Sequence, residues 1–185
     1  MSIKEIIRIS ALLTDRTNVV AYLDKNTNNT DETLSLVQKL LSLTNLVINE
    51  LASTYIPLVK SETVSARDNK VNYSDLSSSV LKIKSVSNTS GKELAFRTFL
   101  HYVSVPEDRV IIEYEYVPED YELNDTVDFD SKFVSARVIA YGVCAELAIT
   151  ESRFDEAVTW HKRYVDAISD ICVPKSAVTK QRSWL

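Results

Sequence analysis

Between Asp31 and Tyr55, apolar residues recur every three or four positions, which leaves this part of the chain little choice of structure. The stripe contains Leu34, Val37, Leu40, Leu41, Thr44, Val47, Ile48, Leu51 and Tyr55. Such spacing predicts one amphipathic helix that buries a single face against other helices. Asn29 or Thr30 can cap the helix, and Pro57 ends it after roughly 25 residues, or about 37 Å.

Between residues 58 and 118 the pattern changes to a period of two. In "RVIIEYEYV", residues 109–117, apolar residues and tyrosines alternate with Glu113 and Glu115. Alternation between turn-like segments predicts an antiparallel sheet, built as a meander of hairpins, with one buried and one solvated face. In "VLKIKSVS" the same alternation predicts that Leu81, Ile83 and Ser85 share a face.

Helical spacing returns after the acidic run that follows this strand. A first helix is expected to begin at a cap formed by Asp128, Asp130 or Ser131. A second helix is expected to place Phe154, Ala157, Val158, Tyr164, Val165, Ile168 and Ile171 on its apolar stripe and to end before Pro174.

The sequence therefore predicts a helix-dominated α+β fold, in which a bundle of N- and C-terminal helices carries an inserted antiparallel β-sheet. We expect a single domain over residues 1–185. Its parts are the N-terminal helices 1–56, the β region 58–118, the C-terminal helix pair 129–172 and an extended basic tail 173–185.

Composition argues against several classes of function. Gly91 and Gly142 are the only glycines, so the chain has no dinucleotide fingerprint, phosphate-binding loop or nucleophile elbow. The net charge of −5 is the wrong sign for a general nucleic-acid binder. No apolar run reaches the roughly 18 residues of a membrane span, and two cysteines give no disulfide framework. We expect an intracellular protein with no membrane partner.

Catalytic candidates are few, and each has a structural explanation. A nucleophile–base pair of Cys144 and His101 is formally possible, but Cys144 lies in an apolar helical stripe that favours a buried structural thiol. Glu113 and Glu115 resemble an acid–base pair, yet they lie on the same side of a strand, as solvated residues do. The sequence predicts no enzyme, no metal site and no cofactor.

The distribution of charge is more informative. Residues 107–130 hold ten carboxylates against Arg109 alone, a net charge of −9 in a chain whose total is −5. The basic tail holds Lys175, Lys180 and Arg182 without an acid and finishes on Trp184 and Leu185. An acidic middle and a basic, aromatic tail suit head-to-tail or asymmetric assembly; the simpler alternative is a solvated acidic loop and a frayed terminus.

Three stretches give the chain a resemblance to the head–tail connector (adaptor, or neck ring) proteins of tailed bacteriophages. They are the helix "DETLSLVQKLLSLTNLVINELASTYIPL", the strand with its proline "VIIEYEYVPEDYEL", and the helix pair "FDSKFVSARVIAYGVCAELAITESRFDEAVTWHKRYVDAI". The ending "QRSWL" after a basic tail is also similar to members of that group. The likeness is one of pattern and order over most of the chain.

The resemblance implies a structural virion protein at the capsid–tail junction, made in the cytoplasm of the host bacterium. Such proteins form a closed ring, commonly of about twelve copies, that joins the portal to the next tail or neck protein and surrounds the exiting DNA without binding it specifically. By the same resemblance, the residues of the basic tail are expected to contact the portal or the adjacent subunit: Lys175, Lys180, Arg182, Trp184 and Leu185.

The acidic residues Glu113, Glu115, Glu119, Asp120 and Glu122 are expected to face the ring channel, where they would repel passing DNA, or to face the next ring. Two alternatives remain open at this stage. One is a tail-completion or neck protein in the next layer of the particle, and the other is a small cytosolic enzyme that uses Cys144 and His101.

Overall fold

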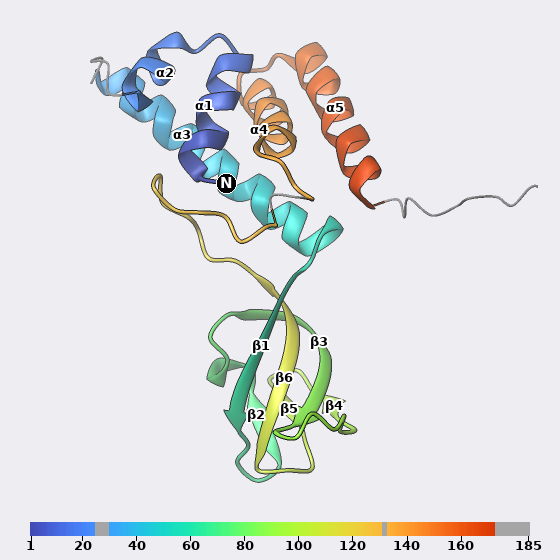
Figure 1. Ribbon diagram of the computed structural model, residues 1–185. Helices are drawn as coiled ribbons and strands as arrows, with labels where there is room; N and C mark the ends of the chain where they lie inside the picture. The colour runs from blue at the N-terminus through green and yellow to red at the C-terminus, as the bar shows by residue number, and fades with distance from the viewer. Residues whose placement is uncertain (25–29, 131–132, 173–185) are drawn as a thin grey trace, which may run out of the picture.

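The structure, a computed structural model, describes residues 1–24, 30–130 and 133–172. In chain order its elements are α1 (Ile3–Leu13), α2 (Thr17–Leu23), α3 (Asp31–Glu50), β1 (Leu58–Ser65), β2 (Lys70–Asn72), β3 (Ser79–Asn88), β4 (Arg97–Thr98), β5 (Tyr102–Ser104), β6 (Arg109–Val117), α4 (Ala136–Thr150) and α5 (Phe154–Cys172). Figure 1 shows the helices gathered into one body and the strands in a second body below it. The predicted helix-dominated α+β fold is confirmed.

The long helix forms where the apolar stripe predicted it. The Thr30 hydroxyl accepts a hydrogen bond of 3.2 Å from the Thr33 amide and so caps α3. The helix continues as a π-helical turn over Leu51–Tyr55, so that the helical run stops just before Pro57. Val37, Leu40, Val47 and Ile48 are among its buried residues, which shows that the predicted face is the one that packs.

Helix α4 is the centre of the helical body, since it contacts α1, α3 and α5. Its buried residues include Ala140, Cys144 and Leu147. A Cβ atom at Gly142 would lie 2.7 Å from Val47 Cγ1 of α3 and 3.1 Å from Tyr164 Cε2 of α5. The missing side chain at this position therefore lets three helices approach one another closely.

The strands form two three-stranded antiparallel sheets with the orders β1-β6-β3 and β2-β5-β4. Val71 and Val103 of the smaller sheet share a hydrophobic cluster with Val110, Ile112 and Tyr114 of the larger one. This cluster is separate from the core of the helical body. The two bodies thus have their own cores; Tyr116, at the end of β6, packs against both.

The predicted meander of consecutive hairpins is wrong for the larger sheet. Strand β6 pairs with β1 and β3 and not with its predecessor β5, whereas β4 and β5 do form an adjacent hairpin. In β3 two register shifts, between Val80 and Lys82 and between Ile83 and Ser85, break the expected alternation. Each shift adds a residue and turns the strand over, so that Ile83 and Val86 are buried while Leu81 is exposed.

Two helical predictions also need correction. Helix α4 begins at Ala136, after Ser135, and not at Asp128 or Asp130, because residues 118–130 are used to run back from the sheet to the helical body. The third predicted cap, Ser131, lies outside the described residues. In α5 the residues Phe154 and Val158 are 64% and 70% exposed instead of buried. The buried face of α5 is carried by Ala157, Tyr164 and Ile168.

The predicted segments agree with the elements for 1–56 and 58–118, and the C-terminal helix pair extends over 136–172 instead of 129–172. That residues 1–185 form a single domain stays a prediction. Among the described residues, no helix has both the length and the apolar character needed to cross a membrane.

Candidate protein interface

The acidic run becomes a strap, residues 118–130, that leaves β6 and passes along the helical body (Figure 1). Asn45 of α3 fixes it with two hydrogen bonds: the Asn45 amide donates to Tyr121 O at 3.1 Å, and the Tyr121 amide donates to Asn45 Oδ1 at 3.0 Å. Asn45 is 8% exposed, so both groups are satisfied out of water. The strap is a fixed part of the fold.

The N-terminus of the chain fixes the other end of the strap. The Ile3 amide donates to Asp125 O at 3.0 Å, and the Val127 amide donates to Met1 O at 3.1 Å. Val127 and Phe129 are buried in the helical core. The apolar residues of the strap face inward and its carboxylates face outward. The many acidic residues that follow β6 are therefore compatible with a strap that packs against the helical core.

A shallow depression of about 350 Å³ collects part of this charge. Its lining comprises Lys60, Ser77, Ser78, Tyr116, Pro118, Glu119, Asp120, Tyr121, Asp125 and Asp128. The Tyr116 hydroxyl donates to Asp128 Oδ2 at 3.0 Å. Burial and this hydrogen bond raise the pKa of Tyr116 to about 12, so its hydroxyl stays protonated as a donor. Burial also raises the pKa of Tyr121, whose hydroxyl accepts a hydrogen bond of 3.3 Å from the Asp128 amide. We call this surface the acidic depression.

The structure separates the five acidic residues that the sequence grouped together. Glu119 and Asp120 line the acidic depression. Glu122 is exposed beside it, in a turn where its amide donates to Asp125 Oδ2 at 2.7 Å. Glu113 and Glu115 lie on the outer face of the larger sheet, opposite the buried Tyr114; Glu113 accepts a hydrogen bond from Ser85 at 3.4 Å.

The acidic depression does not amount to a metal centre. In the described part of the chain, no three His, Cys, Asp or Glu side chains are placed to share a metal ion. What the arrangement supplies is a field of negative charge over a surface that the strap holds rigidly.

One ionised residue that the sequence did not single out is Glu62 of β1. It accepts a hydrogen bond of 2.8 Å from the Tyr114 hydroxyl, hydrogen bonds from Ser77, and an ion pair of 3.2 Å from Lys60. Burial raises the pKa of the Glu62 carboxyl, but these donors outweigh it and lower the pKa to about 2. The group links β1, β6 and the segment before β3, so its role is structural.

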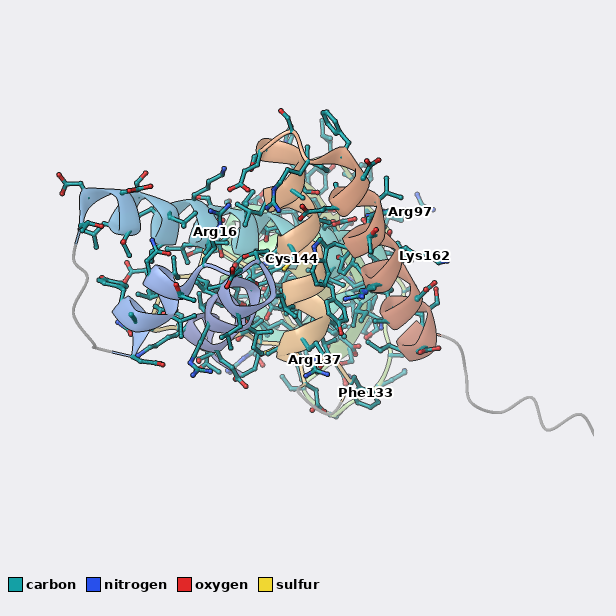
Figure 2. The ribbon with its side chains drawn as sticks, turned by 90° about the horizontal axis from the view of Figure 1, so that it is seen from above. Arg16, Arg97, Phe133, Arg137, Cys144 and Lys162 are labelled. Carbon is teal, nitrogen blue, oxygen red and sulfur yellow. The ribbon has the colours of Figure 1, made fainter. Side chains whose placement is uncertain are left out.

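A larger and more apolar groove lies where the two bodies join. We call it the junction groove; its volume is about 620 Å³. Its lining comprises Tyr55, Ile56, Pro57, Leu58, Val59, Tyr116, Asp128, Phe129, Asp130, Phe133, Val134, Ile171 and Cys172. Phe133 is 67% exposed and Val59 is 44% exposed, and Figure 2 shows Phe133 at the edge of the molecule near the start of α4.

A third surface lies at the opposite end of the helical body. The far-end patch consists of Leu12, Ile149, Phe154 and Val158, which are all exposed. Arg16, in the turn after α1, donates to both Glu151 carboxylate oxygens at 2.7 Å, so the ends of α1 and α4 and the start of α5 lie together. Exposed apolar residues at these helix ends make this end of the body a candidate contact surface.

The residues of the enzyme alternative do not come together. Cys144 is fully buried in α4, in the middle of the helices (Figure 2), and burial raises the pKa of its thiol to about 12. His101 is exposed in the turn between β4 and β5, in the other body. A protonated thiol in a core has neither the charge nor the access of a nucleophile.

The predicted binding residues of the basic tail, Lys175, Lys180, Arg182, Trp184 and Leu185, lie outside the described residues. No pattern in the sequence indicated the junction groove, whose lining residues come from distant segments. Of the acidic depression, the sequence indicated the acidic residues of the strap but not the residues from other segments that complete the lining. For the far-end patch, one signal was present in the sequence: the apolar stripe predicted for α5 includes Phe154 and Val158 and is wider than the face that α5 buries.

No protein-family model and no curated protein matches the chain.

Proposed function

We propose that this protein is a non-enzymatic assembly subunit of a tailed-phage particle, one copy of a connector ring between portal and tail. The observation that carries the proposal is the presence of two unlike surfaces at a distance from each other. The far-end patch is apolar, and the acidic depression is charged.

The separation follows from α1. The depression lies beside Asp125, to which the first residue of α1 is hydrogen-bonded, and the far-end patch includes Leu12 at the last turn of the same helix. An eleven-residue helix is about 16 Å long. Unlike surfaces on different sides allow contacts with different partners, which a head-to-tail ring or a bridge between two rings requires.

The charge of the acidic depression suits both roles proposed for it. A wall of carboxylates along a channel keeps DNA from adsorbing to it, and the same wall steers a basic protein surface into contact. In this proposal the far-end patch contacts a neighbouring copy or the portal through its apolar side chains.

The test is the double substitution Phe154→Ser and Val158→Ser. Both side chains are mostly exposed, so the free energy of unfolding should stay within about 0.5 kcal/mol of wild type. Binding to the portal, or ring formation seen as particle mass, should weaken at least tenfold, since two apolar anchors are lost.

Exposed apolar residues outside the patch provide the matched control. Phe99→Ser and Leu100→Ser change two exposed side chains in the other body and should leave assembly unchanged. If the Phe154 and Val158 variant assembles like wild type, the far-end patch is not the contact and the proposal loses its support.

A further inference from the structure

We propose that the segment 173–185 of the same chain docks in the junction groove and covers Phe133 and Val59. This inference goes beyond the proposed function and does not depend on ring formation. It rests on the groove itself, on where α5 ends, and on charge.

The groove is built to receive apolar side chains. Eleven of its thirteen lining residues are apolar, aromatic or cysteine, and the other two are Asp128 and Asp130. Its volume of about 620 Å³ lies within the range of roughly 300–1,000 Å³ that is typical of binding pockets. The exposed ring of Phe133 leaves a large apolar surface in water unless something covers it.

The proposed occupant, segment 173–185, begins at the edge of the groove and carries charge opposite to that of the groove. Ile171 and Cys172, the last residues of α5, line the groove, and the Cys172 thiol is 3.8 Å from Tyr55 O. Segment 173–185 follows directly and contains three basic residues, no acid, and the apolar Trp184 and Leu185. It thus offers basic residues to the two carboxylates and an aromatic anchor to the apolar wall.

Length allows the segment to return to the groove. The twelve residues from 173 to Trp184 can reach at most about 40 Å, and the groove begins at the residue before them, Cys172. A short segment with one aromatic anchor binds weakly as a free peptide, but its tether gives it an effective concentration in the millimolar range. The segment of the same chain therefore outcompetes that of any other copy in dilute solution.

The experiment uses Trp184 as its own reporter. Trp160 is replaced in the full chain by Trp160→Phe, which keeps an aromatic ring against Tyr141, now at a centroid distance of 5.9 Å. Fluorescence is recorded at a concentration where light scattering gives a monomer of 20.9 kDa. We expect blue-shifted emission and severalfold weaker quenching by acrylamide than for a free peptide of residues 173–185.

The apolar surface of the groove is then reduced by Phe133→Ser together with Val59→Ser, both at exposed positions outside the core. Emission should shift to that of the free peptide. The matched control is Phe154→Ser, an exposed residue at the other end of α5, about 27 Å away along the helix, which should leave emission unchanged. High salt should weaken the docking, because basic residues face Asp128 and Asp130.

Each other outcome overturns the proposal. Protection of Trp184 that appears only as concentration rises would assign the groove to a second copy. Full exposure of Trp184 at every concentration would leave the groove to a different protein. Protection that survives the groove substitutions would place the segment elsewhere on the molecule.

Discussion

At the scale of single residues, the hydrogen bonds of Glu62 explain how strand β1 of the larger sheet holds a partly buried carboxylate. The carboxylate is 19% exposed and is supplied with donors by Tyr114, Ser77 and Lys60. Charge-assisted hydrogen bonds of this kind are stronger than neutral ones. The group therefore works as a clamp between strands, which alternation along the sequence cannot reveal.

This clamp predicts a dependence of stability on pH. The Glu62 pKa of about 2 in the folded chain lies below its ordinary value of 4.5, so the stabilisation is fully present above pH 4.5 and is lost as pH falls toward 2. Glu62→Gln should flatten the loss of unfolding free energy over that interval, as measured by urea unfolding at several pH values. An unchanged slope would contradict the assignment.

The hydroxyl of Tyr114 is the matching donor. Tyr114→Phe keeps the buried ring but removes the 2.8 Å hydrogen bond to Glu62, which should destabilise the fold by about 1–3 kcal/mol at neutral pH. Tyr73→Phe, which removes a hydrogen bond to Phe99 O near the surface, is the control and should cost less. Equal costs would mean that the charge on Glu62 adds nothing.

Gly142 permits a third prediction at this scale. Gly142→Ala would improve helix propensity by about 1 kcal/mol, yet its Cβ would meet Val47 at 2.7 Å, and Val47 is buried and stiff. Overpacking should win, with a net loss of up to about 2 kcal/mol in the free energy of unfolding.

A double-mutant cycle checks this reason for the loss. In the Val47→Ala background the same glycine substitution should cost less than in wild type, because the clashing methyl groups are gone. A gain of stability on Gly142→Ala in wild type would contradict this prediction, because it would show that the three helices leave space for a methyl group at position 142.

At the scale of elements, the strap explains how a charged run can be part of the fold. Its backbone is held by Asn45 and by the start of α1, and its apolar residues enter the helical core. Burial of Val127 and Phe129 also explains why helix α4 starts late: these residues anchor the strap instead of adding turns to a helix.

Asn45→Ala should release the strap. The substitution leaves the amide and carbonyl of Tyr121 without their partner, which should lower the free energy of unfolding by about 1–3 kcal/mol. Hydrogen exchange at the Tyr121 amide should become faster, while exchange at the amides of α3 and β6 should change less. Asn45→Asp keeps the acceptor for the Tyr121 amide and should protect that amide better than alanine does. Unchanged exchange in the alanine variant would show that the strap is held by its apolar residues alone.

The elements also show what the sequence could predict. The helix α3 was predictable from residue 30 to Pro57, since cap, stripe and stop are all local signals. The order of the strands was not, because a period of two fixes which face is buried but not which strand lies alongside. Both edges of β6 are occupied by strands from earlier in the chain, β1 and β3.

The candidate surfaces were less predictable than the fold. The acidic composition of residues 107–130 was visible, but the division of these residues between the outer face of the sheet and the acidic depression depends on where β6 ends, at Val117. The junction groove needs residues from the end of α3, from β1, β6 and the strap, and from the end of α5. No local pattern brings these segments together.

At the scale of the whole molecule, a helical body and a body of strands, each with its own core, meet at one junction (Figure 1). The candidate surfaces lie at this junction and at the far end of the helices. If segment 173–185 covers the junction groove, as inferred above, the isolated chain presents the far-end patch and the acidic depression to its partners. The molecule then has one apolar and one charged surface for assembly.

Charge reversal tests the second of these surfaces. Glu119→Lys, Asp120→Lys and Glu122→Lys, all at exposed positions, should leave the free energy of unfolding within about 1 kcal/mol of wild type and should impair tail joining or DNA passage, measured as infectious yield. Reversal of Glu93, Asp166 and Asp170, which are also exposed, changes the net charge equally and should have little effect. A normal yield from the first variant would refute both roles proposed for the depression.

Light scattering would show whether the chain is a ring subunit at a portal, by particle mass over a wide range of concentration, with and without the cognate portal. We predict one closed multiple of 20.9 kDa, reached at high concentration or on the portal, with no open-ended series of larger particles. A chain that stays at 20.9 kDa at every concentration and ignores the portal would contradict it.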